Sequence, residues 1–242
     1  MESNLTFVLV PGAAHVSAHF KSLVAALNAK GYPTEVVSNP SVGPFAGTLP
    51  PNADVVNLRR ILEELVNEQQ KDIVLVCHSY GGVPGSQSVN GLEKSTARKG
   101  GCFEGGVFEC IPTTAGASEA VSTQWVEIDA TRGIMIPQRS VAAEVLYHDL
   151  VESQAQHWAA KLEPMAVSVT AAPVANVCWG ADVPKVYIFC KMDRAIPFEG
   201  QRKMVERVQI ENKESWKTYE MNCGHSPFLS HVEHLVEILV EA

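Results

Sequence analysis

The chain has 242 residues, 46% of them apolar, which suffices for one substantial core and is short for two independent domains. Its net charge of −8 argues against a nucleic-acid or anionic-membrane surface, because either would need clustered Lys and Arg. No apolar run reaches the roughly 18 residues that span a bilayer, and the first residues lack the features of a signal peptide. We therefore expect a cytoplasmic protein.

Strand-like and helix-like patterns alternate along the chain. Strands that alternate with helices imply a parallel sheet covered by helices on both faces. We therefore predict an α/β fold whose doubly wound, mostly parallel sheet has about six strands. The predicted strands cover residues 6–10, 34–37, 72–77, 106–111, 185–190 and 216–221. The predicted helices around them include residues 20–27, 55–65 and 232–239.

The segment between the fourth and fifth predicted strands is much too long to be a bare loop in a compact domain. It holds helical patterns at 140–150 and 153–162. We interpret residues 113–183 as a cap inserted into one domain that spans residues 1–242. Aromatic residues in such a cap either pack it onto the core or line an apolar substrate pocket. Trp125 is the one that we expect to contact the substrate.

Ser79 is the best nucleophile candidate, because it lies where an apolar run meets a series of small residues. A buried strand that turns sharply into a helix presents a serine hydroxyl at the tip of the turn. The backbone N–H of the next residue, Tyr80, then lies beside that hydroxyl. The motif departs from the G-x-S-x-G pattern at one position, where Cys77 replaces the first glycine.

An acid and a base follow this serine in the order Ser, Asp, His. Asp193 comes just past the fifth predicted strand, and His225 comes just past the sixth. Catalytic groups gather beyond the carboxyl ends of strands in an open parallel sheet, so Ser79, Asp193 and His225 can converge there. Asp129 and Asp149 are the alternatives for the acid, but neither follows a predicted strand.

These residue types divide the work of nucleophilic catalysis. The imidazole takes the serine proton and returns it to the leaving group, while the carboxylate fixes the imidazole tautomer. The oxyanion needs donors, which we assign to the backbone N–H groups of Tyr80 and of Ala13, in the loop after the first strand. An acyl-enzyme would form on Ser79 and be released by water. The scheme calls for no metal or organic cofactor.

Four motifs resemble those of the α/β-hydrolase superfamily, in the same order and at the same strand ends. The chain is most similar to the compact branch of plant methylesterases and hydroxynitrile lyases, and to related small fungal hydrolases. The resemblance runs from about Leu5 to the C-terminal helix and is weakest between residues 91 and 184. It implies a small, largely apolar carboxylic ester or lactone as substrate. The motifs are Pro11–His15, His78–Gly82, Asp193–Pro197 and Gly224–Ser230.

The resemblance also bears on the reaction. Hydroxynitrile lyases of that branch typically carry a threonine in the oxyanion loop and a lysine directly after the catalytic histidine. Here these positions are Gly12 and Ser226, which favours ester hydrolysis. Two alternatives stay open: a lyase or cyclase that acts on a secondary metabolite by proton transfer with the same triad, and a ligand receptor on the same fold. A homodimer is also left open.

Several other polar residues have two interpretations. Gly12, His15 and His78 flank the oxyanion loop and the nucleophile, where they are candidate substrate contacts, although either histidine could instead make structural hydrogen bonds. For His19 and four further histidines we expect surface roles. The cysteines show neither a C-x-x-C pair nor zinc spacing, so we interpret them as buried thiols. They are Cys77, Cys102, Cys110, Cys178, Cys190 and Cys223.

Overall fold

The computed structural model describes residues 4–93, 103–108, 123–171, 174–181, 183–213 and 215–241. Its main sheet has six strands, and every neighbouring pair in that sheet is parallel. The predicted α/β fold with a mostly parallel sheet is therefore confirmed. In spatial order the strands are β2 (Thr34–Val36), β1 (Leu5–Val10), β3 (Asp72–Cys77), β4 (Phe103–Phe108), β8 (Lys185–Cys190) and β9 (Lys217–Met221).

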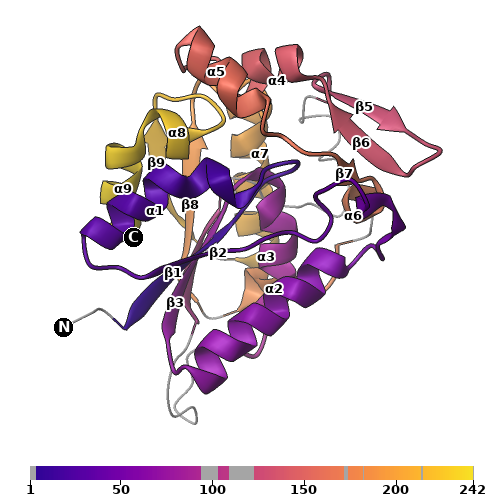
Figure 1. The fold of residues 1–242 in the computed structure, drawn as a ribbon. Helices are drawn as coiled ribbons and strands as arrows, with labels where there is room; N and C mark the ends of the chain where they lie inside the picture. The colour runs from indigo at the N-terminus through magenta and orange to yellow at the C-terminus, as the bar shows by residue number, and fades with distance from the viewer. Residues whose placement is uncertain are drawn as a thin grey trace.

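Helices cover both faces of the main sheet (Figure 1). They are α1 (Lys21–Ala29), α2 (Ala53–Glu63), α3 (Gly82–Ser88), α7 (Phe198–Asn212), α8 (Pro227–Ser230) and α9 (Val232–Glu241). Successive residues of a strand point to opposite faces of its sheet. In β1, Phe7 and Leu9 therefore pack in the apolar cluster that includes α1 and α9. Val8 and Val10 pack in the other cluster, with α2 and α7.

The order of the strands places two pairs of loops side by side. The chain passes from β1 to β2 on one side and then returns to β3 on the other side of β1, which creates a topological switch point. Val10 at the end of β1 pairs with Cys77 at the end of β3. In the other half of the sheet, Cys190 at the end of β8 pairs with Met221 at the end of β9. Residues that directly follow these strands are therefore neighbours.

The segment between β4 and β8, called here the inserted segment (residues 109–184), contains a second sheet that the sequence did not predict. This sheet is antiparallel, in the order β5-β6-β7, and the helices α4 and α5 are the two predicted ones. In Figure 1, α4, α5 and the β5–β6 hairpin lie at the top, opposite the N-terminus. The described elements are β5 (Val126–Asp129), β6 (Ile134–Pro137), α4 (Arg139–Leu146), α5 (Glu152–Ala159), β7 (Met165–Ala166) and α6 (Ser168–Ala171).

Element boundaries agree with the predictions closely in some places and less closely in others. Two strands coincide with the predicted ranges, whereas β4 begins at Phe103, three residues before the predicted 106, and residues 109–111 lie outside the described part. α2 continues as a π-helical turn, Glu64–Glu68. No helix among the described residues is long and apolar enough to cross a membrane. Short 3-10 turns occupy Ser17–Phe20, Ala46–Thr48, Ser79–Gly81 and Cys178–Gly180.

Candidate active site

Ser79 lies at a sharp turn between β3 and α3. Its φ angle is +50°, a left-handed conformation that is strained for any residue except glycine. His78 before it is extended, and a short 3-10 turn begins at Ser79 itself and leads into α3. The side chain is half-buried. The strand, strained turn and helix therefore form a sharp elbow at Ser79, the backbone shape that the sequence predicted.

The loop after β1 comes close to this elbow. A Cβ atom built on Gly12 would lie 3.0 Å from Ser79 Cβ and 2.6 Å from His78 Nδ1, which is too close for any side chain. The loop is held by a turn in which the His15 N–H donates to the Gly12 carbonyl (3.2 Å). Ala13, the next residue in the loop, is half-buried. Gly12 therefore lets the Ala13 segment lie beside Ser79, where the sequence places the second oxyanion donor.

His225 and Asp193 form a buried hydrogen bond in the other half of the sheet. His225 Nδ1 lies 2.8 Å from Asp193 Oδ2, and the two side chains are 3% and 1% exposed. A carboxylate only accepts hydrogen bonds, so the neutral imidazole carries its proton on Nδ1 and its lone pair on Nε2. The other carboxylate oxygen accepts the N–H groups of Ala195 (2.7 Å) and Ile196 (2.9 Å). Asp193 is therefore held in one orientation by its own turn.

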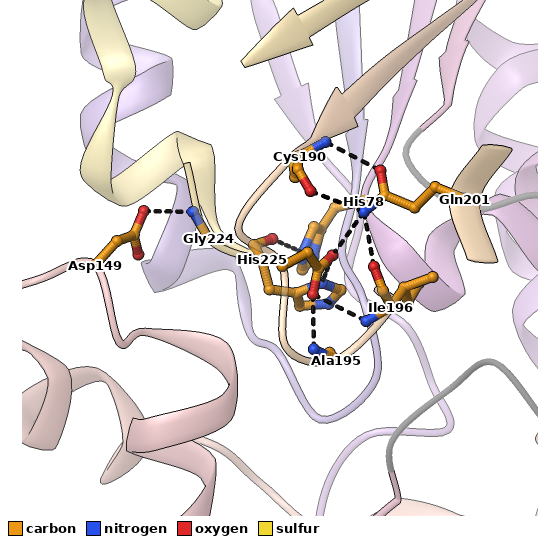
Figure 2. Close-up of polar contacts among 9 residues, drawn as sticks. His78, Asp149, Cys190, Ala195, Ile196, Gln201, Gly224 and His225 are labelled. Carbon is orange, nitrogen blue, oxygen red and sulfur yellow. Dashed lines mark hydrogen bonds and ion pairs between the residues drawn. The ribbon is translucent and has the colours of Figure 1, made fainter. Parts of the chain in front are cut away.

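The side chain of Gln201, on α7, holds the Asp193 turn in place through hydrogen bonds. The sequence analysis did not predict a role for this residue. Figure 2 shows its side-chain amide between Cys190 and Ile196. Its Nε2 donates to the carbonyls of Cys190 (2.9 Å) and Ile196 (2.7 Å), and its Oε1 accepts the Cys190 N–H (3.0 Å). One sequence feature could have indicated Gln201: it is a glutamine on the buried face of α7, three residues before Met204 and four before Val205.

His78 joins the two halves of the site. Its Nε2–H donates to the backbone carbonyl of His225 (3.0 Å), as Figure 2 shows, and the centroids of the two rings are 4.8 Å apart. Burial holds the pKa of His78 well below its usual value of 6.5, and the charge of a protonated His225 lowers it further. The residue next to Ser79 is thus a neutral donor that binds the backbone of the candidate base. This is the structural interpretation of His78, and substrate contact by it stays a prediction.

Two more histidines continue this buried row of rings away from His225. His15 lies 4.9 Å from His78 and 4.8 Å from His19, measured between ring centroids. The expectation that His19 lies on the surface is wrong, because its side chain is buried and its Nε2 lies 3.2 Å from the Trp158 carbonyl. Burial is the largest cause that lowers the pKa of both residues. Since this environment favours neutral rings, His15, His19 and His78 are uncharged near neutral pH.

His15 connects the oxyanion loop to the inserted segment. Its Nδ1–H donates to the Ala13 carbonyl (2.8 Å), which leaves Nε2 to accept the O–H of Tyr147 (2.9 Å). Burial raises the pKa of the Tyr147 phenol well above its usual value, so the phenol stays a donor. His15 thus supports the candidate oxyanion loop from within the protein. Whether it also meets a substrate is a prediction that these contacts do not test.

The side chain of Tyr80 is anchored far from its backbone N–H. Its hydroxyl donates to Asp54 Oδ2 (2.8 Å), and the Ser41 hydroxyl (2.5 Å) donates to the same oxygen. The Ser41 N–H donates to the other oxygen of Asp54 (2.9 Å). Burial, followed by the Asp54 charge, raises the pKa of the Tyr80 phenol. Sequence reasoning missed Asp54, since an acid in the first turn of a helix is ordinary there.

The remaining candidates take less central positions. Trp125 is 8% exposed and belongs to the same buried cluster as Ala142 and Ala143 of α4, as the packing interpretation expects. Asp129 ends β5 and accepts the Arg132 N–H (3.0 Å) within its own hairpin. Asp149, by contrast, accepts the N–H of Gly224, the residue before His225 (2.7 Å). Neither alternative acid contacts the imidazole of His225 in the way that Asp193 does.

Metal ligands and thiols complete the survey of reactive groups. Within the described ranges, no group of three or more His, Cys, Asp or Glu side chains could hold a metal ion. Cys102 and Cys110 lie outside the described residues. The other four cysteines are buried thiols, as predicted: Cys77, Cys178, Cys190 and Cys223.

Comparison with known proteins identifies the family. The profile described as the alpha/beta hydrolase family matches residues 7–237. The chain belongs to the alpha/beta hydrolase family. It is 27% identical to the alpha/beta hydrolase nvfD of Aspergillus novofumigatus (strain IBT 16806), over 97% of this chain and 95% of that protein. The resemblance that the four motifs indicated is thereby confirmed.

Solved structures share the fold of this alpha/beta hydrolase over nearly its whole length. Polyneuridine aldehyde esterase superposes with a TM-score of 0.75 at 18% identity, covering 100% of this chain and 99% of that one. The methylesterase MES16 from Arabidopsis superposes with a TM-score of 0.72 at 20% identity, covering 98% of each chain. At these identities the likeness concerns the fold, and the chemistry must be argued from the side chains.

Proposed function

We propose that this alpha/beta hydrolase is a serine esterase that cleaves a small, largely apolar carboxylic ester or lactone through an acyl-enzyme on Ser79. One observation carries the proposal: the buried 2.8 Å hydrogen bond from His225 Nδ1 to Asp193 Oδ2 leaves Nε2 as the basic nitrogen. The strained elbow at Ser79 and the esterase names among proteins of the same fold support it.

Each candidate residue has one task in the proposed reaction. His225 Nε2 takes the proton of the Ser79 hydroxyl as its oxygen bonds to the substrate carbonyl carbon. The negative oxygen of the tetrahedral intermediate accepts the N–H groups of Ala13 and Tyr80. The intermediate collapses, and the leaving alcohol takes the proton from the imidazolium, which Asp193 stabilises. Water then repeats these steps and releases the acid.

The inserted segment is proposed to be a cap that provides the apolar part of the substrate site. Its Tyr147 and Asp149 contact loops of the candidate site, which places part of the segment at the carboxyl edge of the main sheet. Trp125 remains our candidate for an aromatic contact with substrate. An apolar lining with a few polar groups is the usual composition of a small-molecule site.

The surroundings of Gly12 favour hydrolysis over a lyase reaction that would use a threonine hydroxyl there. A Cβ atom at this position would lie 2.6 Å from Nδ1 of His78 and 2.9 Å from its Cε1. A threonine would therefore displace the ring that binds the His225 carbonyl. The serine after His225, Ser226, also offers no cation for a departing anion.

A screen of short p-nitrophenyl esters and aromatic lactones against native protein and Ser79→Ala tests the proposal. Loss of a true nucleophile should lower kcat by ~10⁴-fold or more, and mass spectrometry should detect an acyl group on Ser79 with a slow ester. Ser86→Ala is the matched control, because that hydroxyl donates to the Val83 carbonyl of its own helix (3.1 Å). Equal turnover by native protein and Ser79→Ala would refute the covalent mechanism. Proton-transfer products without an acyl group would favour the lyase or cyclase.

A further inference from the structure

One short stretch of the inserted segment contacts three loops of the candidate site. The stretch, residues 144–149, includes the end of α4 and the turn after it, and we call it the clasp. Asp149 accepts the Gly224 N–H (2.7 Å) on the loop that carries His225. Tyr147 bonds His15 (2.9 Å) on the loop after β1. The clasp therefore reaches loops that lie at opposite halves of the main sheet.

The third contact of the clasp concerns the loop that carries the candidate acid. Arg194, which directly follows Asp193, donates from a guanidinium nitrogen to the backbone carbonyl of Glu144 (3.2 Å). The acid loop, the base loop and the oxyanion loop are thus all tied to six consecutive residues. These loops are far apart in sequence. Their shared contacts with residues 144–149 keep their relative positions fixed.

The contact between Asp149 and Gly224 is the most specific of the three. Figure 2 shows the Asp149 carboxylate directed at the Gly224 nitrogen from the inserted segment. The Asp149 side chain is only 6% exposed, and its Oδ1 has no hydrogen-bond partner among the described residues. A buried carboxylate with one unsatisfied oxygen is unfavourable for stability. Its bond to the base loop therefore indicates a role other than stabilising the fold. His231 Nδ1 lies 3.8 Å from Asp149 Oδ2.

The glycine at position 224 is explained by this contact. A Cβ atom on Gly224 would lie 2.7 Å from Asp149 Oδ1 and 2.9 Å from its Cγ. Gly224 is not among the described glycines with a left-handed backbone, so close contacts, with Asp149 Oδ1 first and His148 Cε1 next at 2.9 Å, are what exclude a side chain. The residue that follows is His225. The carboxylate therefore sets the backbone position from which the imidazole projects.

We propose that the clasp is a positioning element of the site, in which Asp149 holds the His225 loop and Tyr147 holds the oxyanion loop through His15. The inference rests on the proposed function of the site and adds two positioning residues to it. Neither residue needs to touch the substrate. Misplacement of a catalytic group by about 1 Å can cost roughly 10²-fold in rate, so loss of either contact should reduce kcat more than it raises KM.

Three variants test the role of Asp149. Asp149→Ala removes the acceptor and should lower kcat roughly 10²-fold, with KM changed less than threefold. Asp149→Asn keeps an oxygen toward the Gly224 N–H and should restore kcat to within about fivefold of native. Asp129→Ala is the matched control, since it removes another aspartate of the inserted segment, one that accepts the Arg132 N–H within its own hairpin. An alanine variant with native kcat, or no recovery with asparagine, would overturn the proposal.

Measurements that need no turnover separate this inference from the proposed function. In Asp149→Ala the Gly224 amide should lose its protection from hydrogen exchange, and the low-field NMR signal of the His225 Nδ1 proton should broaden. The reaction of Ser79 with a fluorophosphonate should slow in parallel. If the native protein neither hydrolyses esters nor reacts with the fluorophosphonate, the proposed function is wrong. The two NMR measurements on Asp149→Ala still test the clasp in that case. An unchanged Gly224 amide and His225 proton would refute the clasp even in an active esterase.

Tyr147→Phe tests the other arm of the clasp with little change of shape. It removes only the O–H that His15 Nε2 accepts and keeps the buried ring. We expect kcat to fall about tenfold, because His15 loses the partner that fixes the tautomer in which it donates to the Ala13 carbonyl. The thermal midpoint should stay close to native. A native kcat in this variant would remove the oxyanion loop from the proposal.

Discussion

At the scale of single residues, Gly12 shows how little space the site leaves. Its hydrogen points at the His78 ring, where a Cβ atom would come within 2.6 Å of Nδ1, and at Ser79 Cβ, at 3.0 Å. Contacts this short force a neighbour to move. The ring that would have to move is the one that donates to the His225 carbonyl (3.0 Å). One methyl group at Gly12 should therefore disturb both halves of the site.

Gly12→Ala is predicted to lower kcat by roughly 10²-fold, because the displaced His78 ring shifts the base relative to Ser79. Kinetics with the best ester of the screen measure this, together with the thermal midpoint. Gly180→Ala is the control, since a Cβ atom there finds its nearest neighbour, Asn212 Oδ1, at an ordinary 3.8 Å. If the two variants have equal activity, Gly12 is not under the constraint described.

Residues of the site differ in how far the sequence reveals them. The sequence could indicate Ser79, Asp193 and His225 as candidates because each follows a predicted strand, and strand ends meet at one edge of a parallel sheet. Gln201 acts through the backbone of a turn outside its own helix, and Asp54 acts through residues of two other loops, which no local periodicity encodes. The same holds for the buried contacts of the histidines, which a sequence shows only as polar residues near helical patterns.

At the scale of elements, Asp54 at the start of α2 ties the elbow to the loop after β2. It accepts the hydroxyl of Tyr80 and both the N–H and the hydroxyl of Ser41. The Ser41 carbonyl in turn accepts the Ala166 N–H of β7 (2.9 Å). The Tyr80 ring packs in the same apolar cluster as Met165 and Ala166. One buried carboxylate therefore links α2, the elbow and the inserted segment.

Tyr80→Phe is predicted to destabilise the fold by about 1–3 kcal/mol, because the buried Asp54 carboxylate loses one of its hydrogen-bond donors. Urea unfolding measures this difference. Tyr219→Phe is the matched control, because its hydroxyl bonds the exposed Glu241 (3.3 Å) and should change stability by less than about 0.5 kcal/mol. Equal stabilities of the two variants would show that the Asp54 bond contributes nothing.

The elements themselves were predictable where burial imposes a pattern and not elsewhere. β3 and β8 are apolar runs buried on both faces, so their predicted and observed bounds coincide. The β5–β6 hairpin lacks such a pattern, since Ile128 is 61% exposed and β5 has no buried residue. β7 has two residues, Met165 and Ala166, too few for any periodicity. The second sheet depends on contacts with the rest of the protein, which the sequence pattern does not display.

At the scale of the whole molecule, the buried histidines make stability depend on pH. Burial lowers the folded-state pKa of His15, His19 and His78 below the ordinary value of 6.5. In the unfolded chain these rings titrate at about 6.5. As the pH falls through that value, the unfolded chain binds protons that the folded chain does not, so the free energy of unfolding decreases.

We predict that the free energy of unfolding falls between pH 7.5 and 5.5, with a slope of up to about 1.4 kcal/mol per pH unit for each of the three histidines. Urea titrations at several pH values measure the slope. His19→Asn should lower this slope by the amount that corresponds to about one proton taken up on unfolding. The same change at the exposed His234 should leave the slope unaltered. A stability that is constant over this range would contradict the neutral, buried state of the row.

The distribution of the site along the chain has a consequence for how such an enzyme can diversify. The elbow and the oxyanion loop precede residue 93, and the acid and base loops follow residue 184, so the intervening stretch carries none of the proposed reacting groups. Under the proposed function, sequence changes in that stretch are expected to alter substrate selectivity while leaving the reacting groups unchanged. Residues 144–149 are an exception, because they contact the loops that carry the candidate acid, base and oxyanion donor, and substitutions there should be tolerated less.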